Sequence, residues 1–479
     1  MARVSATVSA SVPPARTADL FAPGVRGLTV GLVSTITLVA IESLAIGTVL
    51  PIVSDELGNP ELYGWVYASF FLGNLVGIVL AGGALDRMPL HRPFAVGLAL
   101  FAIGLLVGGL ALSMPMLVFA RFIQGLGGGT MGPTAYVAIG RGLPERLQPR
   151  MFAMLSTAWV VPGIVGPSLA ALVGETVGWR WVFLGLLPLL LVAGGVALSA
   201  LRRVGGTPDP AEVARHRTRT RLVRAIGTAF GAGLLLVGLG ATEPLMVVAG
   251  SIVGLAILVP SFRWLTPPGT LRLAVGVPAA IFLRAVMTFA FFSADAFIPL
   301  LLQTWRGTPA FLTGVVFTAT TVAWTAGTWI QARRIDHVGP RFFTALGFGL
   351  IAVGAFITIP TLIPGVPPEL SILTWTLPGL GMGFMYSAVT LVVLRGSQPA
   401  EQGSASSSLQ LADILGTALG TGVAGALTAA GIRAGGDGLG EALAAVFAMS
   451  GVVALFGMLA ARRLGRIGPL LTARSAAVD

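Results

Sequence analysis

Residues 181–200 read WVFLGLLPLLLVAGGVALSA, an apolar run of 20 residues without a charged side chain. A helix of that length is about 30 Å long, which matches the hydrocarbon thickness of a bilayer. The whole chain has this character, because 55% of its 479 residues are hydrophobic and only 10% are charged. Soluble proteins carry about 25% charged residues. The sequence therefore predicts an all-α polytopic membrane protein.

Fourteen segments are apolar over roughly the ~20 residues that a membrane-spanning helix needs. They are residues 28–53, 63–85, 93–112, 116–140, 151–173, 181–200, 225–241, 245–262, 276–302, 310–332, 342–362, 371–394, 403–430 and 441–461. The two segments that flank Glu243-Pro244 are the shortest, so they either span the bilayer or form a re-entrant hairpin, which would leave twelve spans. Their 17 and 18 residues suffice for crossing, and we expect fourteen spans.

The arginines test this map, because cytoplasmic loops of membrane proteins are rich in basic residues. All 30 basic residues are arginine, and 25 of them fall in the tails and loops that lie inside when the N-terminus is cytoplasmic. Three lie outside (Arg180, Arg306 and Arg433) and two lie within spans (Arg121 and Arg284). Both termini are therefore predicted to be cytoplasmic. The net charge of +11 is a topology signal, and no nucleic-acid partner is expected.

Cysteine is absent, which excludes disulfides, thiolate metal sites and a cysteine nucleophile. The three histidines (His91, His216 and His337) fall in predicted loops, so a histidine proton relay or metal site within the spans is not expected. The first 26 residues lack the apolar core of a signal peptide and are predicted to form a cytoplasmic tail.

Two loops indicate an internal duplication. Residues 82–92, after the second span, and 332–341, after the tenth, each have an aspartate at the helix end and an arginine five or six places later. The tenth span is the second of the last six, so the two loops occupy equivalent places. Two six-helix halves with a substrate site between them at mid-membrane are a known transporter plan.

Further motifs lie on particular spans: residues 41–51 on the first, 82–92 after the second, 121–127 on the fourth, 163–167 on the fifth and 179–183 before the sixth. In this order they resemble the motifs of the major facilitator superfamily, in its fourteen-span branch of drug:proton antiporters. The resemblance covers about residues 28–461. The sequence departs from the family pattern at Glu42, where aspartate is usual, and at Pro89 and Ala170, where glycine is usual.

The resemblance implies a major facilitator fold of two six-helix halves plus two extra central helices. The corresponding division is a cytoplasmic tail (1–27), the first half (28–200), a loop and the extra helices (201–275), the second half (276–463) and a second tail (464–479). It implies a monomeric multi-pass protein of the bacterial inner (plasma) membrane, surrounded by lipids, that carries a small molecule and protons. It also implies that the protein is not an enzyme and has no cofactor, with the proton gradient as its energy source.

Five charged residues lie inside predicted spans, away from the span ends: Glu42, Arg121, Arg284, Asp295 and Asp413. Each costs at least about 2.5 kcal/mol of insertion free energy, so each needs a partner or a function. A buried carboxyl group can hold a proton in one conformation and release it in another, and we expect proton coupling at Glu42, Asp295 and Asp413. Arg121 matches a motif residue that the resemblance links to proton coupling. The alternative for each carboxyl is a permanently protonated group bonded to a neighbouring helix.

Arg284 and Asp295 lie 11 residues apart on one span. Eleven residues place them on nearly the same helix face and about 16 Å apart along the axis, which is too far for an ion pair. They are expected to line one water-accessible cavity at two depths, or else to pair with polar groups on other helices.

The expected gating residues are Asp86, Arg87 and Asp336 at one membrane face, and Gly166-Pro167, which interrupts helical hydrogen bonding. The expected substrate-binding residues are Trp65, Tyr67, Trp159, Arg284, Phe292, Trp324, Tyr386 and Gln410. Aromatic side chains offer an adaptable apolar surface, although most aromatics in spans face lipid or other helices.

These features predict a proton-coupled secondary transporter that exports amphipathic or lipophilic small molecules by alternating access. The alternatives are a lipid, siderophore or metabolite carrier of the same superfamily, including an importer. A membrane enzyme or receptor lacks support, because no soluble domain and no recognisable nucleophile–base spacing is present.

Overall fold

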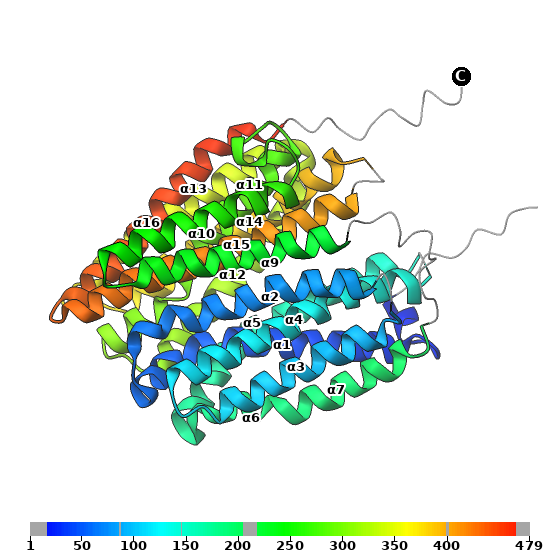
Figure 1. Cartoon of the computed structure of the whole chain (residues 1–479), viewed down its shortest axis with the longest axis horizontal. Coiled ribbons are helices and arrows are strands. Elements are labelled where there is room, and N and C mark those ends of the chain that lie inside the picture. The colour runs from blue at the N-terminus through cyan, green and yellow to red at the C-terminus, as the bar shows by residue number, and fades with distance from the viewer. Residues whose placement is uncertain (1–16, 86–87, 145, 205–217, 399–401, 466–479) are drawn as a thin grey trace, which may run out of the picture.

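The computed structural model describes residues 17–85, 88–144, 146–204, 218–398 and 402–465, and every regular element in these ranges is a helix (Figure 1). The main helices are α1 (Arg26–Leu57), α2 (Tyr63–Leu85), α3 (His91–Gly109), α4 (Met114–Gly142), α5 (Gln148–Val173), α6 (Arg180–Leu184), α7 (Leu186–Leu201), α9 (Thr218–Gly240), α10 (Pro244–Leu265), α11 (Val277–Asp295), α12 (Ala310–Val338), α13 (Pro340–Thr358), α14 (Leu370–Gly396), α15 (Gln402–Ala434) and α16 (Gly438–Ala460). Short α6 and longer α7 meet at Gly185 and together form one span.

The fourteen predicted spans each correspond to a helix or helix pair. In the described ranges, thirteen segments are long and apolar enough to cross a membrane. The fourteenth is α4, whose 29 residues suffice in length but include Arg121, Gln124 and many glycines, which lower its hydropathy. Helix α4 packs against α2 and α3, and its Arg121 and Gln124 are buried, so these two side chains do not face lipid. The prediction of an all-α polytopic fold is confirmed.

Helices α9 and α10 are long enough to span rather than to turn back midway. They have 23 and 22 residues, or about 33 Å each at 1.5 Å per residue. In Figure 1 both run along the bundle beside the other helices.

The same helix pairing occurs twice. In the first helix group (α1–α7), α1 packs on α5 and α7, α2 on α4, and α3 on α4 and α7. In the second helix group (α11–α16), α11 packs on α15 and α16, α12 on α14, and α13 on α14 and α16. This repetition agrees with the duplication that the two loop motifs indicate.

The two helix groups meet along two seams, one between α2 and α15 and the other between α5 and α12. Helix α9 packs against both α2 and α15, and α10 packs on α9. The helices that are central in the sequence therefore lie on the flank of the bundle, over one seam only.

Glycines on α4 and α14 allow close helix approach at equivalent places in the two groups. A methyl group on Gly125 would lie 2.0 Å from the Phe70 carbonyl oxygen of α2. On α14, a methyl group on Gly383 would lie 2.2 Å from the Trp324 carbonyl oxygen of α12. Small residues at helix crossings permit such packing within membranes.

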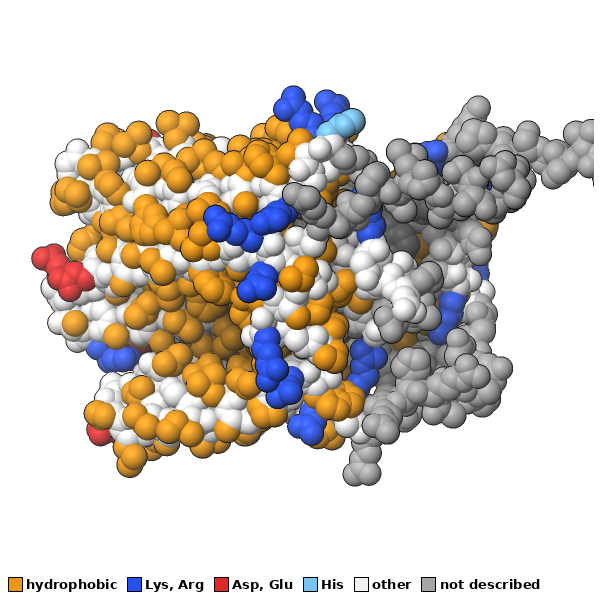
Figure 2. Space-filling model, turned by 90° about the horizontal axis from the view of Figure 1, so that it is seen from above, with side chains coloured by type: hydrophobic (Ala, Val, Ile, Leu, Met, Phe, Trp, Pro, Cys, Tyr) orange, Lys and Arg blue, Asp and Glu red, His pale blue; other side chains and the backbone are white. Residues whose placement is uncertain are grey.

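The two ends of the bundle differ in charge. Helix termini at one end carry arginines, among them Arg92, Arg141, Arg202, Arg334 and Arg395, and we call this the arginine-rich end. Helix termini and connections at the other end carry Glu56, Glu61, Glu175, Glu369 and Glu441, and we call it the acidic end. Figure 2 shows acidic side chains at one extreme, arginines toward the other, and a mainly apolar flank between them.

Replacing Gly125 with alanine should destabilise the fold by about 1–3 kcal/mol, because the added methyl group overlaps the α2 backbone. Thermal unfolding of the detergent-solubilised protein measures the effect. Gly140→Ala on the same helix is the control, because a methyl group there meets open space. Equal unfolding temperatures for the two variants would contradict this account of α2–α4 packing.

Candidate functional site

Glu42 and Arg121 form an ion pair inside the first helix group. Arg121 Nη1 donates to Glu42 Oε1, and Gln124 Nε2 donates to the same oxygen at 3.3 Å. The side chains are almost inaccessible, with exposed fractions of 1% for Glu42 and 2% for Arg121. Helix α1 supplies the carboxylate and α4 supplies both donors, so the pair joins two helices that are distant in sequence.

The arginine is held more completely than the carboxylate. Arg121 Nε donates to the Val66 carbonyl oxygen at 3.3 Å, Nη1 donates to Gln124 Oε1 at 3.1 Å, and the guanidinium lies 4.4 Å from the centre of the Phe70 ring. Within the described residues, Glu42 Oε2 is buried without a hydrogen-bond partner. This oxygen is a place where a proton could bind.

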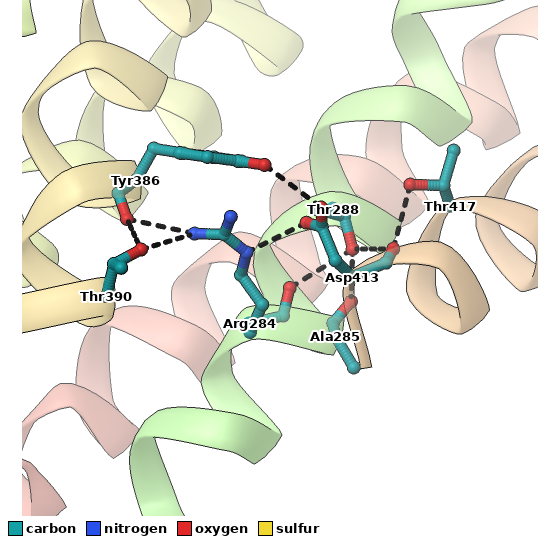
Figure 3. A network of polar contacts seen from close by, with 7 residues as sticks. All are labelled: Arg284, Ala285, Thr288, Tyr386, Thr390, Asp413 and Thr417. Carbon is teal, nitrogen blue, oxygen red and sulfur yellow. Dashed lines mark hydrogen bonds and ion pairs between the residues drawn. The ribbon is translucent and has the colours of Figure 1, made fainter. Parts of the chain in front are cut away.

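A second ion pair lies in the second helix group (Figure 3). Arg284 Nε on α11 donates to Asp413 Oδ1 on α15 at 2.8 Å, and the Tyr386 hydroxyl on α14 donates to Asp413 Oδ2 at 3.0 Å. Arg284 Nη1 also donates to the Tyr386 carbonyl oxygen at 2.9 Å and to the Thr390 hydroxyl at 3.4 Å. Three helices thus meet on one guanidinium.

The Asp413 carboxylate is the open edge of this second pair. Its side chain is 23% exposed, whereas that of Arg284 is 5% exposed. The Arg284 guanidinium lies 3.3 Å from the centre of the Tyr386 ring, which covers its face. A proton or a solute can therefore reach Asp413 more readily than Arg284.

Asp295, at the end of α11, has a different partner. Trp375 Nε1 on α14 donates to Asp295 Oδ1 at 2.8 Å. Of the two readings of Arg284 and Asp295, the structure shows pairing with groups on other helices: Asp413 for Arg284 and Trp375 for Asp295. In agreement with the 11-residue spacing, they do not pair with each other.

Aromatic rings form a continuous line from the second ion pair to the first helix group. Tyr386 lies 5.6 Å from Trp324, and Trp324 lies 5.7 Å from Phe291 (ring centres). Phe291 contacts Phe292 at 5.1 Å, and Phe292 reaches Phe71 of α2 at 6.5 Å. We call Tyr386, Trp324, Phe291, Phe292 and Phe71 the aromatic line.

The structure places the other predicted substrate-binding residues outside this line. Trp159 is 46% exposed on α5, and Trp65 is partly buried on α2. Tyr67 is buried beside Tyr63, with ring centres 6.0 Å apart. Gln410 is partly buried on α15, about one turn before Asp413.

Sequence reasoning missed Trp375, Thr390, Phe70 and Phe71. Each is a residue type that is common in membrane spans, so nothing in the sequence distinguishes it, and only the fold shows what it contacts. An apolar ring beside a charge carries no signal in one sequence, so no pattern would have found these residues.

The structure describes only some of the predicted gating residues. Asp86 and Arg87, as well as the side chain of Asp336, lie outside the described residues. Gly166 does not provide a close approach, because a methyl group there would meet open space. Close approach of α5 and α12 occurs instead at Gly314 of α12, where a methyl group would lie 3.0 Å from Ser168 Cα. Helix α5 runs without interruption past Pro167 to Val173.

Among the residues that the structure describes, five hydrogen bonds join the two helix groups toward the acidic end. They are Tyr63 Oη to Ala296 O, Gln303 Nε2 to Thr48 O, Ala310 N to Glu175 Oε1, Thr318 Oγ1 to Ile164 O, and the contact between Ser168 Oγ and Thr318 Oγ1. The α2–α15 seam is also tight there, where Gly64 and Gly425 face each other. The two helix groups are therefore held together at the acidic end.

Among the described residues, no three His, Asp or Glu side chains gather as a metal site would require.

A family model described as Major Facilitator Superfamily matches residues 28–421. The chain belongs to this superfamily. It is 27% identical over 416 residues to a probable multidrug-efflux transporter of Mycobacterium tuberculosis, covering 83% of this chain and 87% of that one. It is 22% identical over 410 residues to the multidrug transporter protein MdtP of Bacillus subtilis, covering 84% and 74%.

Solved structures of other transporters share the fold. An auto-inhibited peptide transporter of the POT family matches with a TM-score of 0.70 at 15% identity, over 94% of this chain and 99% of that one. A bacterial homologue of the human lysosomal transporter Spinster, inward-facing and unoccupied, matches with a TM-score of 0.63 at 17% identity, over 93% and 99%. The protein is thus a multi-pass membrane transporter of the major facilitator superfamily, a family whose members carry small molecules.

Removing one member of the Arg284–Asp413 pair should destabilise the protein, because a charge is left without its partner inside the bundle. Breaking a buried pair costs about 3–5 kcal/mol of unfolding free energy, and the partial exposure of Asp413 points to the lower end of that range. The double variant Arg284→Gln/Asp413→Asn should lose less than the sum of the two single losses. Thermal unfolding of the two single variants and the double variant measures this coupling.

Arg180→Gln is the control for this comparison, because the Arg180–Glu56 pair is exposed (33% and 50%) and exposed pairs contribute little. Additive losses at Arg284 and Asp413 would show that the pair does not couple the three helices.

Proposed function

We propose that the protein exports amphipathic or lipophilic small molecules in exchange for protons. The observation that carries this proposal is the Glu42 carboxylate, buried in the bundle with one oxygen bound to Arg121 and Gln124 and the other unpartnered among the described residues. Such a carboxylate is poised to take up a proton, and the charge of the pair changes when it does.

Protonation at Glu42 alters the contacts between α1 and α4. The ionised carboxylate attracts Arg121, whereas the neutral acid keeps only hydrogen bonds to it. Arg121 retains its contacts with Val66, Gln124 and Phe70, so it can stay in place while α1 is released. The proton thus weakens one helix contact without leaving the arginine free of partners.

Asp413 and Asp295 extend this proton-dependent control to the second helix group. A proton on Asp413 would weaken its attraction to Arg284, which holds α11 to α15. A proton on Asp295 would weaken the hydrogen bond from Trp375, which holds α11 to α14. All three carboxyl groups lie on helices at the interior of the bundle, where a change of contact affects how the groups pack.

The aromatic line suits an amphipathic substrate. Its rings are flat and apolar. The line begins at Tyr386, which is bonded to the partly exposed Asp413, and ends at Phe71 in the first helix group. A substrate with an apolar body and a polar end would find both kinds of contact there.

The relatives that are named as multidrug-efflux transporters favour export as the direction. The groups are fastened at the acidic end, so we place the opening at the arginine-rich end. Cytoplasmic loops of membrane proteins are rich in arginine, so we infer that the arginine-rich end and both chain termini face the cytoplasm, in an inner membrane. A carrier in this state would load its substrate from the cytoplasm.

A substrate-panel efflux assay in whole cells tests this function. Cells that produce the protein should accumulate less of at least one lipophilic dye or drug than cells that carry an empty vector. Addition of a protonophore should abolish the difference, because collapse of the gradient removes the energy source. Efflux that persists without the gradient would point to another ion or to facilitated diffusion, and accumulation would point to an importer.

Glu42→Gln should abolish proton-driven efflux while substrate exchange in the absence of a gradient continues. Glutamine resembles the protonated acid and cannot release a proton, but it still accepts a hydrogen bond from Arg121. Proteoliposomes loaded with substrate measure both activities on one preparation. The control is Glu61→Gln at the acidic end, which should leave both unchanged. Normal proton-driven efflux by the Glu42 variant would exclude this residue from coupling.

Asp295→Asn should also abolish proton-driven efflux, because asparagine cannot take up and release a proton. Folding and insertion should be retained, because asparagine keeps an oxygen that can accept the hydrogen bond from Trp375. Efflux assays and the unfolding temperature test this variant. Glu369→Gln, on the surface of the acidic end, is the matched control. Unimpaired efflux would mean that Asp295 has only a structural role.

A further inference from the structure

Helices α9 and α10 form a hairpin whose two members are tightly packed on each other. A methyl group on Gly254 of α10 would lie 2.5 Å from the backbone nitrogen of Leu235 on α9. One on Gly250 would lie 2.6 Å from Gly238 Cα, and one on Gly231 would lie 2.6 Å from the nitrogen of Leu258. Backbones this close leave no room for sliding, so the hairpin is one rigid unit.

The hairpin interlocks with the second helix group. Leu236 of α9 fills the space over Gly422 of α15, where a methyl group would lie 2.4 Å from its Cδ1 atom. At the end of α10, Ser408 of α15 donates its hydroxyl hydrogen to the Leu265 carbonyl oxygen at 2.9 Å. Side-chain and backbone contacts therefore hold the hairpin to α15 at two positions along that helix, Ser408 and Gly422.

The connection from α10 to α11 adds a third attachment. Residues 266–276 carry two buried threonines, Thr266 and Thr270, each bonded to a nearby carbonyl. Gly276 N, just before α11, donates to the Arg463 carbonyl oxygen at 3.1 Å, beside the end of α16. This short, folded link connects α10 directly to α11, and its last residue is bonded beside the end of α16.

The contact with the first helix group is of a different kind. Gly233 of α9 faces Leu72 of α2, and a methyl group on Gly233 would lie 3.7 Å from Leu72 Cδ1, an ordinary van der Waals distance. The buried residues of α9 include four small ones, Ala225, Thr228, Ala229 and Ala232, so few long side chains are available to interlock with a neighbouring helix. A surface without protruding side chains can slide along a neighbour.

We propose that the α9–α10 hairpin moves as one body with the second helix group and slides along α2 while the transporter changes state. It then keeps the α2–α15 seam covered when the two helix groups rock apart, so that lipid does not enter the substrate path from this side. The α5–α12 seam has no such cover in the described structure, so the two seams differ in function. This inference rests on the proposed alternating-access function, although its motion can be measured without a substrate.

Cysteine cross-linking tests the inference directly, because the chain contains no cysteine. One double variant, Leu236→Cys/Gly422→Cys, joins the hairpin to α15, and the other, Leu72→Cys/Gly233→Cys, joins it to α2. A short bis-methanethiosulfonate reagent that forms reducible bridges should leave transport by the first variant within about twofold of the uncrosslinked protein. It should lower transport by the second at least tenfold, and reduction should restore it. Loss in the first variant, or normal transport in the cross-linked second, would overturn the proposal.

Spin labels at the same two pairs supply a measurement that does not depend on transport. In detergent or nanodiscs, the distance between labels at 236 and 422 should keep one narrow distribution from pH 5 to pH 8. The distance between labels at 72 and 233 should gain a second population over the same range. A second population at 236–422 would contradict the rigid attachment. Absence of drug efflux combined with the expected distances would refute the proposed substrate class and leave the inference standing.

Discussion

The hydrocarbon interior of the membrane supplies no hydrogen bonds and solvates no charge, and this constraint explains most of the structure. Backbone groups must be satisfied within each segment, which makes the described spans helices. Charged side chains must find partners inside the protein, which brings Glu42 to Arg121 and Arg284 to Asp413. Both pairs join helices that are far apart in sequence, so the same constraint that shapes the helices also holds them together.

The two ion pairs are unequal in the same way, because the arginine has more partners than the carboxylate. The arginine of each pair has additional partners: Val66, Gln124 and Phe70 for Arg121, and the Tyr386 carbonyl, Thr390 and the Tyr386 ring for Arg284. Within the described part of the chain, Glu42 retains one unpartnered carboxylate oxygen, and the Asp413 side chain is partly exposed. Protonation of either carboxylate removes one attraction and leaves the arginine with its other partners.

Close helix packing within each of the two similar groups depends on glycine. Gly125 on α4 and Gly383 on α14 bring their helices against α2 and α12 at distances that a side chain would prevent. The polar residues of α4 are thereby covered on both sides, which explains why this helix, the least hydropathic of the fourteen spans, still lies within the bundle. Close packing within each group contrasts with the looser contact of α9 with α2, where a methyl group on Gly233 would lie 3.7 Å from Leu72 Cδ1.

The sequence by itself determined the helices, since an apolar run of about 20 residues has no other stable form in a bilayer. Residues 225–241 and 245–262 were the shortest predicted spans, and the structure extends both to full length at Thr218–Gly240 and Pro244–Leu265. The sequence also identified the five charged span residues, because each carries an energetic penalty that composition reveals. The tertiary structure alone decided their partners, the role of Gly314 in place of Gly166, the aromatic line, and the place of α9 over one seam. The physical reason is that hydropathy and charge are properties of single segments, whereas pairing and packing depend on which helices become neighbours, and in one sequence nothing local specifies that.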